Sequence, residues 1–233
     1  NDILLGVVIG KAAGVTYLAI NARCECALVQ ITRGQLAAAE ETCRLALGST
    51  DEEALSPTGL AWSILGEIAR ERNDLATAER LIPFGIEIAR KGGIIDDLRH
   101  ALLFLVRLRQ AQGNWGAAHA AWAEVDTLLN SYNMPRLSIL SAAHRAHLDL
   151  TQGYIVSAGR WARQYQQQRS SQESVYLREF EDLTFIRVLL AEGKSDEALQ
   201  WLRPLTASAR EAGRNRTVIE ACILQARALA KRD

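Results

Sequence analysis

Four polar side chains recur at one position of a repeated pattern, and they are the strongest candidates for chemistry in this sequence. They stand at intervals of 40 residues, each six residues before a Gly or Asn: Glu67, Arg107, His147 and Arg187. Carboxylate, guanidinium and imidazole groups recognise charged or hydroxyl-bearing molecules through charge-assisted hydrogen bonds. We call these four the polar column and predict that it contacts an anionic or hydroxyl-rich ligand.

A second set of polar residues is expected near the same surface, because each residue stands early in a helix that also carries a column residue. These are His100, Tyr176, Arg178 and Glu179. The alternative for the column itself is structural. Its side chains would then only solvate an inner helical face and pair with one another, as one polar stripe in a helical stack is expected to do.

The motifs of the common enzyme classes are absent from the sequence. It contains no Walker-type phosphate loop, no His-Glu-x-x-His, no Gly-x-Ser-x-Gly and no dinucleotide fingerprint. His144 and His147 lie three residues apart but have no carboxylates at metal-ligand spacing, which favours packing or surface roles. We therefore expect a binding protein rather than an enzyme, with no metal and no cofactor in this domain.

The elements that must position the polar column are revealed by an internal repeat. A short turn-like segment occurs five times, centred on Gly34, Asn73, Gly113, Gly153 and Gly193. Five residues after each of these comes an alanine: Ala39, Ala78, Ala118, Ala158 and Ala198. A Gly or Asn in the left-handed conformation ends one helix so that the next begins at once, and the small alanine suits a close helix crossing.

Amphipathic segments flank each of these turns. The pattern predicts helices over Leu60–Arg72 and Ala76–Lys91, and again over Leu177–Glu192 and Asp196–Ala212. A sixth first helix is expected near Thr217, because Thr217 to Glu220 has the form of a capping box. The predicted links between repeats are Gly48–Pro57, Gly92–Leu98, Asn130–Arg136 and Ser170–Ser174.

Such a helix pair cannot bury its apolar face alone, so neighbouring pairs must stack. We therefore predict an all-α fold, a right-handed α-α superhelix made of about five to six helix-pair repeats of about 40 residues. It resembles the tetratricopeptide repeat, with longer units. Because the links are short and recur in register, residues 1–233 are expected to form a single domain.

Charge and cysteine usage narrow the function classes further. Lys plus Arg and Asp plus Glu number 27 each, so the net charge is zero and nucleic-acid binding by this segment is not favoured. The four cysteines match no zinc or disulfide spacing and are expected as free thiols in a reducing cytoplasm. No apolar stretch is long enough to span a membrane. The first residue is Asn1, from which we expect a domain of a larger protein.

The segment Tyr176–Gly193 resembles a hallmark of the large MalT-like, LuxR-type transcriptional activators. Shorter segments resemble the same family, and together they span most of the chain: Ser56–Ala61, Asn73–Glu79, Gly85–Arg90 and Pro135–Leu137. Asp182 departs from the motif, which has Tyr at this position. The family offers no fixed ligand signature that can be transferred to this chain.

The resemblance implies an architecture and a role. Family members carry an N-terminal nucleotide-binding ATPase module, a central helical-repeat sensor and a C-terminal helix-turn-helix that binds promoter DNA, and this chain resembles only the sensor. The implied function is effector reception, by a small molecule or a regulatory protein, together with self-association in the full-length protein. DNA contact would come only from a C-terminal domain outside this chain. The alternative is a TPR-like scaffold that binds a peptide or protein without a role in transcription.

Overall fold

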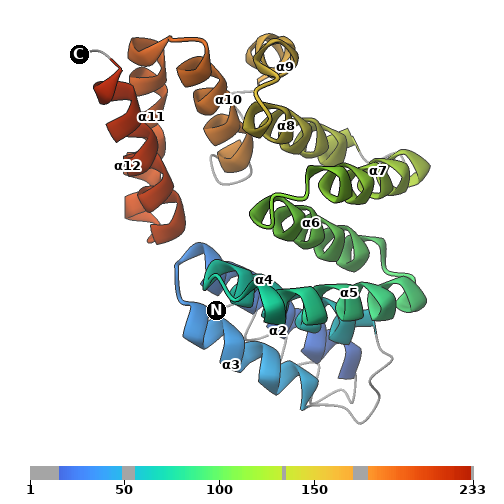
Figure 1. Cartoon of the computed structure of the whole chain (residues 1–233). Coiled ribbons are helices and arrows are strands. Elements are labelled where there is room, and N and C mark those ends of the chain that lie inside the picture. Colours follow the sequence, from blue (N-terminus) through green and yellow to red (C-terminus); the bar gives the residue numbers. More distant parts are fainter. Residues whose placement is uncertain (1–15, 49–55, 133–134, 170–177, 232–233) are drawn as a thin grey trace. The chain divides into compact units, whose positions relative to one another are not determined.

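A computed structural model describes residues 16–48, 56–132, 135–169 and 178–231 of the chain. Within these ranges the regular elements are eleven α-helices, with no strand, which confirms the predicted all-α fold. The helices fall into two compact units, Asn1–Tyr132 and Asn133–Asp233. Tight turns join the two helices of each pair (Figure 1).

The helices of the first unit are α2 (Thr16–Thr32), α3 (Leu36–Leu47), α4 (Ser56–Glu71), α5 (Leu75–Gly92), α6 (Ile95–Ala111) and α7 (Trp115–Tyr132). Those of the second unit are α8 (Pro135–Thr151), α9 (Ile155–Gln168), α10 (Glu179–Ala191), α11 (Ser195–Glu211) and α12 (Asn215–Ala230). The first helices of the pairs are therefore the even-numbered ones. The polar column lies on four of them, α4 and α6 in the first unit and α8 and α10 in the second.

The five predicted turns have the expected backbone conformation. The angle φ is positive at Gly34, Asn73, Gly113, Gly153 and Gly193. At the first turn, the Gln35 N–H donates to the Gln30 carbonyl at 2.9 Å and the Gly34 N–H donates to the Ile31 carbonyl at 2.9 Å. These two bonds satisfy carbonyls at the helix end in the Schellman pattern, so each turn reverses the chain within three or four residues.

The alanine that follows each turn is completely buried. Its exposed fraction is 0% in all five repeats, at Ala39, Ala78, Ala118, Ala158 and Ala198. A larger side chain at this position would displace the neighbouring helix, because interiors are packed to near-crystalline density. The spacing of turn and alanine in the sequence therefore predicted both the pairing of the helices and a position that is fully buried in each pair.

The last helix begins near Thr217, as predicted, but without the predicted capping box. α12 begins at Asn215, and its N-cap residue Arg214 makes no side-chain capping hydrogen bond. Gly213 has φ of 68° and closes a turn like the other five, in which the Arg214 N–H donates to the Ala209 carbonyl at 2.8 Å. A helix capped by Thr217 would begin at Val218, so α12 starts three residues earlier than that, and Thr217 is buried inside its first turn.

The connections between repeats are shorter than predicted where the structure describes them. α4 begins at Ser56 and so includes Pro57 in its first turn, where a proline is well tolerated. α6 begins at Ile95 and α8 at Pro135, within two of the predicted links. Residues 170–174 lie outside the described ranges, as does Leu177, and α10 begins at Glu179.

Helices α4 and α5 approach each other so closely at Gly59 and Gly85 that neither position has room for a side chain. A Cβ placed on Gly85 would lie 2.4 Å from the Gly59 carbonyl oxygen and 2.8 Å from the Ser63 amide nitrogen. A Cβ on Gly59 would lie 2.6 Å from the Ala89 amide nitrogen. Both contacts are with backbone, which cannot move aside without separating the helices. The glycine pair therefore sets the distance between the two helices.

Partly exposed polar contacts repeat in register between successive pairs. Arg72, next to the second turn, donates to Glu40 of α3 at 2.6 Å. One repeat later, Gln112 and Arg109 donate to Glu79 of α5, each at 2.8 Å. Each carboxylate stands six residues after its own turn. These partly exposed contacts contribute little energy individually but fix the register of neighbouring repeats.

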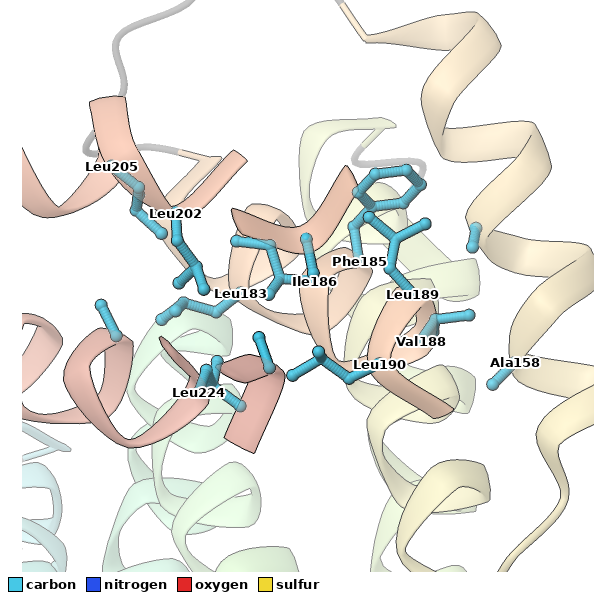
Figure 2. Packing of buried hydrophobic residues seen from close by; sticks show 14 of the residues in the cluster. Ala158, Leu183, Phe185, Ile186, Val188, Leu189, Leu190, Leu202, Leu205 and Leu224 are labelled. Carbon is cyan, nitrogen blue, oxygen red and sulfur yellow. The ribbon is translucent and has the colours of Figure 1, made fainter. Parts of the chain in front are cut away.

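The core of the second unit surrounds α10, which is buried on nearly all sides. Figure 2 shows side chains of α10 packed between those of its neighbours, with Leu202 and Leu205 from α11 and Leu224 from α12 on one side. Ala158 of α9 lies on another side. A helix covered all round must bury its polar residues too, and α10 buries Glu179, Glu181, Asp182 and Thr184.

The four cysteines are free, and they differ sharply in burial. Cys24 and Cys43 are buried, Cys26 is partly buried and Cys222 is exposed. Burial raises the pKa of the Cys43 thiol to about 12, and it also raises the pKa of Cys24. Because the thiolate is the reactive form, these two should not react in the folded protein.

We expect Cys222 to react first with a thiol reagent such as dithionitrobenzoate at pH 8, and Cys24 and Cys43 to react only after urea is added. Absorbance of the released chromophore counts the thiols. Four should react in denaturant, and the Cys222→Ser variant should lack the fast phase. Rapid reaction of all four in buffer would contradict the described packing around α2 and α3.

Among the described residues, no helix combines the length and apolar character that crossing a membrane requires.

Candidate functional site

In the first unit, the two column residues form a buried ion-pair cluster with a third side chain. Glu67 of α4 has an exposed fraction of 0%, and its Oε1 accepts from Arg107 Nη1 of α6 at 3.0 Å. Arg70 donates to the same carboxylate twice, from Nε to Oε2 at 2.8 Å and from Nη2 to Oε1 at 3.0 Å. Both carboxylate oxygens are therefore engaged, and here the column residues pair with one another across the repeat.

The cluster is held by its surroundings as well as by its charges. The Arg107 guanidinium lies 5.9 Å from the centre of the Phe104 ring on the same helix. Burial by itself lowers the pKa of Arg70, but the hydrogen bonds and charge of Glu67 outweigh it and raise that pKa above its usual value. Two arginines thus share one buried carboxylate, and their remaining charge is partly exposed to solvent.

His100 lies on α6, two turns before Arg107, in a polar environment of its own. Its Nδ1 is 3.0 Å from the Asp96 carbonyl and its Nε2 is 3.0 Å from Nη2 of Arg99. These partners suit a neutral imidazole that donates from Nδ1 and accepts at Nε2. Burial, and then the charge of Arg99, lower the pKa of His100 to about 4.

We expect His100 to remain neutral in the folded chain down to about pH 5, whereas in the unfolded chain it titrates near its ordinary pKa of about 6.5. The unfolded state then binds more protons between these values, so His100 lowers stability as the pH falls from 6.5 toward 4. Imidazole C–H shifts in NMR spectra report the titration directly, and His100→Asn assigns the resonance. A midpoint near 6.5 in the folded protein would contradict this environment.

In the second unit, the histidines of α8 pack against an aromatic ring of α10. The ring of His144 stacks on Phe180 with centroids 3.8 Å apart, and His147 meets the same ring edge-on at 6.0 Å. Both are partly buried. In the part of the chain that the structure describes, no group of three or more His, Cys, Asp or Glu side chains is arranged to hold a metal ion.

Arg187 of α10 has an incomplete set of hydrogen-bond partners among the described residues. Its Nη2 pairs with Glu220 of α12, whereas its Nη1 is buried and has no hydrogen-bond partner among the described residues. Burial, followed by the charges of Arg227 and Arg216, lowers the pKa of Arg187 to about 10. Arg187 therefore pairs with the Glu220 carboxylate while it experiences the positive charge of two further arginines of α12.

The second set of predicted residues meets different partners. Glu179, at the start of α10, accepts from Arg214 Nε at 2.9 Å, and Arg214 also donates to Ser208 at 3.1 Å. Arg178 is buried, and its Nε and Nη1 have no partner within the described ranges. Tyr176 lies outside those ranges. Glu179 thus ties α10 to the turn before α12.

Asp182 was singled out in the sequence as an exception to a motif, and the structure gives it a role. It is buried on α10 and accepts from the Tyr165 hydroxyl at 2.8 Å and from Arg169 Nε at 3.0 Å, both on or next to α9. The Arg169 guanidinium also lies 4.6 Å from the centre of the Trp201 ring of α11. Sequence reasoning missed this cluster, because Asp182 lies 17 residues from Tyr165 and 13 residues from Arg169, and no local pattern links them.

Two cavities lie away from the polar column. The larger, of about 490 Å³, opens between α3, α4 and α5, and combines apolar side chains such as Trp62 and Leu65 with the Glu40 and Arg72 pair. The smaller, of about 310 Å³, lies between α11 and α12 and is lined partly by Arg203. Each is a potential binding surface formed between first and second helices.

Comparison with known proteins points to one family. The family described as the MalT-like TPR region matches residues 9–233 of the chain. The search of curated proteins found no match to the chain.

Proposed function

Because the chain belongs to the MalT-like TPR family, we propose that it is the effector-binding and oligomerisation domain of a cytoplasmic, LuxR-type, ATP-dependent transcription regulator. It would receive a small-molecule inducer, a regulatory protein or both. The observation that supports this most directly is the incompletely paired Arg187 on the helix stack of such a domain. A buried donor without a partner in the described part of the chain is what an absent ligand would satisfy.

The proposed action is differential binding rather than catalysis. A stack of helix pairs responds to a ligand when one arrangement of the pairs binds it better than another, and the ligand then shifts the population toward that arrangement. The coupling between effector binding and self-association would be about 1 to 3 kcal/mol. In this proposal the domain itself uses no cofactor, and nucleotide and DNA binding belong to other domains of the full-length protein.

The proposal is tested by a thermal-shift screen of the purified chain against oligosaccharides, amino acids, aromatic acids and other small metabolites. A ligand at 100 times its Kd stabilises the folded state by about 2.7 kcal/mol, which gives a clear rise in melting temperature. We expect a saturable rise for one chemical class, accompanied by a change in oligomeric state measured by light scattering. Unchanged melting temperatures throughout the screen would count against a small-molecule effector.

A protein partner is the second candidate, and exposed apolar surface favours it. Ile219 and Ile223 of α12 are 62% and 56% exposed, although they lie one turn apart on a regular helix. Apolar side chains spaced four residues apart on an exposed helical face are typical of protein-binding surfaces. Capture of a defined regulatory protein by the wild-type chain but not by Ile219→Ser/Ile223→Ser would support this candidate.

A further inference from the structure

The polar column is electrostatically different in the two units. In the first unit, both carboxylate oxygens of Glu67 accept hydrogen bonds from Arg70 and Arg107. The charges of this cluster therefore satisfy one another. In the second unit, the corresponding residue is Arg187, and the carboxylate facing it, Glu220, is 39% exposed. Nη1 of Arg187 is left buried without a partner in the described ranges. The same repeat position is thus satisfied in one unit and incomplete in the other.

Helix α12 presents more positive charge on the side that meets Arg187. Arg216, Glu220, Ile223 and Arg227 are spaced by four, three and four residues, which places them along one stripe of the helix. The pairing of Glu220 with Arg187 shows that this stripe faces α10. Because Arg216 and Arg227 act on the charge of Arg187, all three guanidinium groups lie within electrostatic reach of one another.

Ile223, the uncharged residue of the stripe, adds exposed apolar surface to it. Ile223 is 56% exposed and lies between Glu220 and Arg227 along the helix. A ligand held by the guanidinium groups would therefore also meet an apolar side chain. This combination suits a small organic anion with an apolar portion better than it suits an inorganic ion.

We propose that Arg187 and Arg227 form a binding site for the carboxylate or phosphate group of a small organic molecule, with Ile223 against its apolar part. This inference rests on the proposed sensor function and names the chemical class of its effector. Guanidinium groups bind such oxyanions through paired, charge-assisted hydrogen bonds. An arriving anion would satisfy Nη1 of Arg187 and compete with Glu220 for the same cations.

Replacing Glu220 should change the affinity for anions in the opposite direction from replacing either arginine. Glu220→Gln removes the competing negative charge and should tighten anion binding about fivefold or more, whereas Arg187→Gln and Arg227→Gln should weaken it about tenfold. Arg227 is exposed, so its replacement is not expected to disturb folding. Arg160→Gln on the exposed face of α9 is the matched control, with the same charge change in the same unit.

The experiment titrates the full chain with benzoate, phenyl phosphate, inorganic phosphate and, as a neutral control, benzyl alcohol. Calorimetry at low ionic strength gives each Kd, and NMR signals of the arginine Nε–H groups locate the binding. Circular dichroism checks that every variant is folded. We expect saturable binding of the organic anions with the pattern of variants given above. Tighter binding of benzoate identifies a carboxylate ligand, and tighter binding of phenyl phosphate identifies a phosphate.

Absence of saturable anion binding, or equal binding by the Arg160→Gln and Arg227→Gln variants, would overturn the proposed site. Two further outcomes separate failure of this site from failure of the proposed sensor function. An effector found in the thermal-shift screen that binds Arg187→Gln and Arg227→Gln as well as wild type would uphold the sensor and remove this site. Anion binding with the expected pattern, but with no effect on oligomeric state, would uphold the site and count against the sensor.

Discussion

Replacing Glu67 by alanine is expected to lower the free energy of unfolding by about 3 kcal/mol, the largest effect of any single charged residue in the first unit. The carboxylate is completely buried and holds Arg70 and Arg107 through three hydrogen bonds. Without it, two guanidinium groups with mostly buried side chains face each other, and the carboxylate that remains near them is that of Glu71, which pairs with Arg70. Urea unfolding followed by circular dichroism measures the loss.

Glu79→Ala is the matched control for this prediction. Glu79 also binds an arginine of the next repeat, but its side chain is 41% exposed. An exposed pair of this kind contributes about 1 kcal/mol or less, because water replaces the lost partner. If Glu67→Ala and Glu79→Ala had equal effects, the Glu67 cluster would not be buried as described.

Replacing Gly85 by alanine should cost about 2 to 3 kcal/mol, although alanine normally strengthens a helix. The new methyl group would overlap the backbone of α4 at Gly59 and Ser63, and backbone in a packed helix cannot turn away as a side chain can. The helices would have to separate along their contact. Thermal and urea unfolding both report the loss, and Gly59→Ala should behave in the same way for the reciprocal reason.

Replacing Gly116 of α7 by alanine is expected to stabilise the same unit rather than destabilise it. A Cβ at this position would meet no atom within 4 Å, so Gly116→Ala gains helix propensity without a clash. It should raise the free energy of unfolding by about 0.5 to 1 kcal/mol. Tolerance of alanine at Gly85 would show that the close approach of α4 and α5 is not as described, and destabilisation by Gly116→Ala would contradict the open surroundings of α7 at Gly116.

Features that depend on a few neighbouring residues could be predicted from the sequence. A glycine in the left-handed conformation ends a helix by local sterics, and the buried alanine five residues later follows from the same turn. The sixth turn, at Gly213, was missed because it follows Gly193 after 20 residues rather than 40. This turn has a local sequence like the others, but it lies outside the 40-residue spacing by which the five turns were identified.

Features that depend on distant partners could not be predicted in the same way. The sequence placed Glu67 and Arg107 in one column, but it did not decide between ligand contacts and mutual pairing, and these two residues do pair. It identified Asp182 as unusual without indicating Tyr165 and Arg169, because only the packing of α9 on α10 brings them together. The role of the polar column in binding a ligand stays a prediction.

The central claim, that this helix stack is an effector sensor whose ligand meets Arg187, is tested most directly by one comparison. The melting temperatures of the wild-type chain and of Arg187→Gln are measured side by side across a library of small organic anions and neutral metabolites. We predict a saturable rise for an anion in the wild type that is lost or greatly reduced in Arg187→Gln. Equal shifts in both proteins, or shifts with neutral compounds alone, would contradict it.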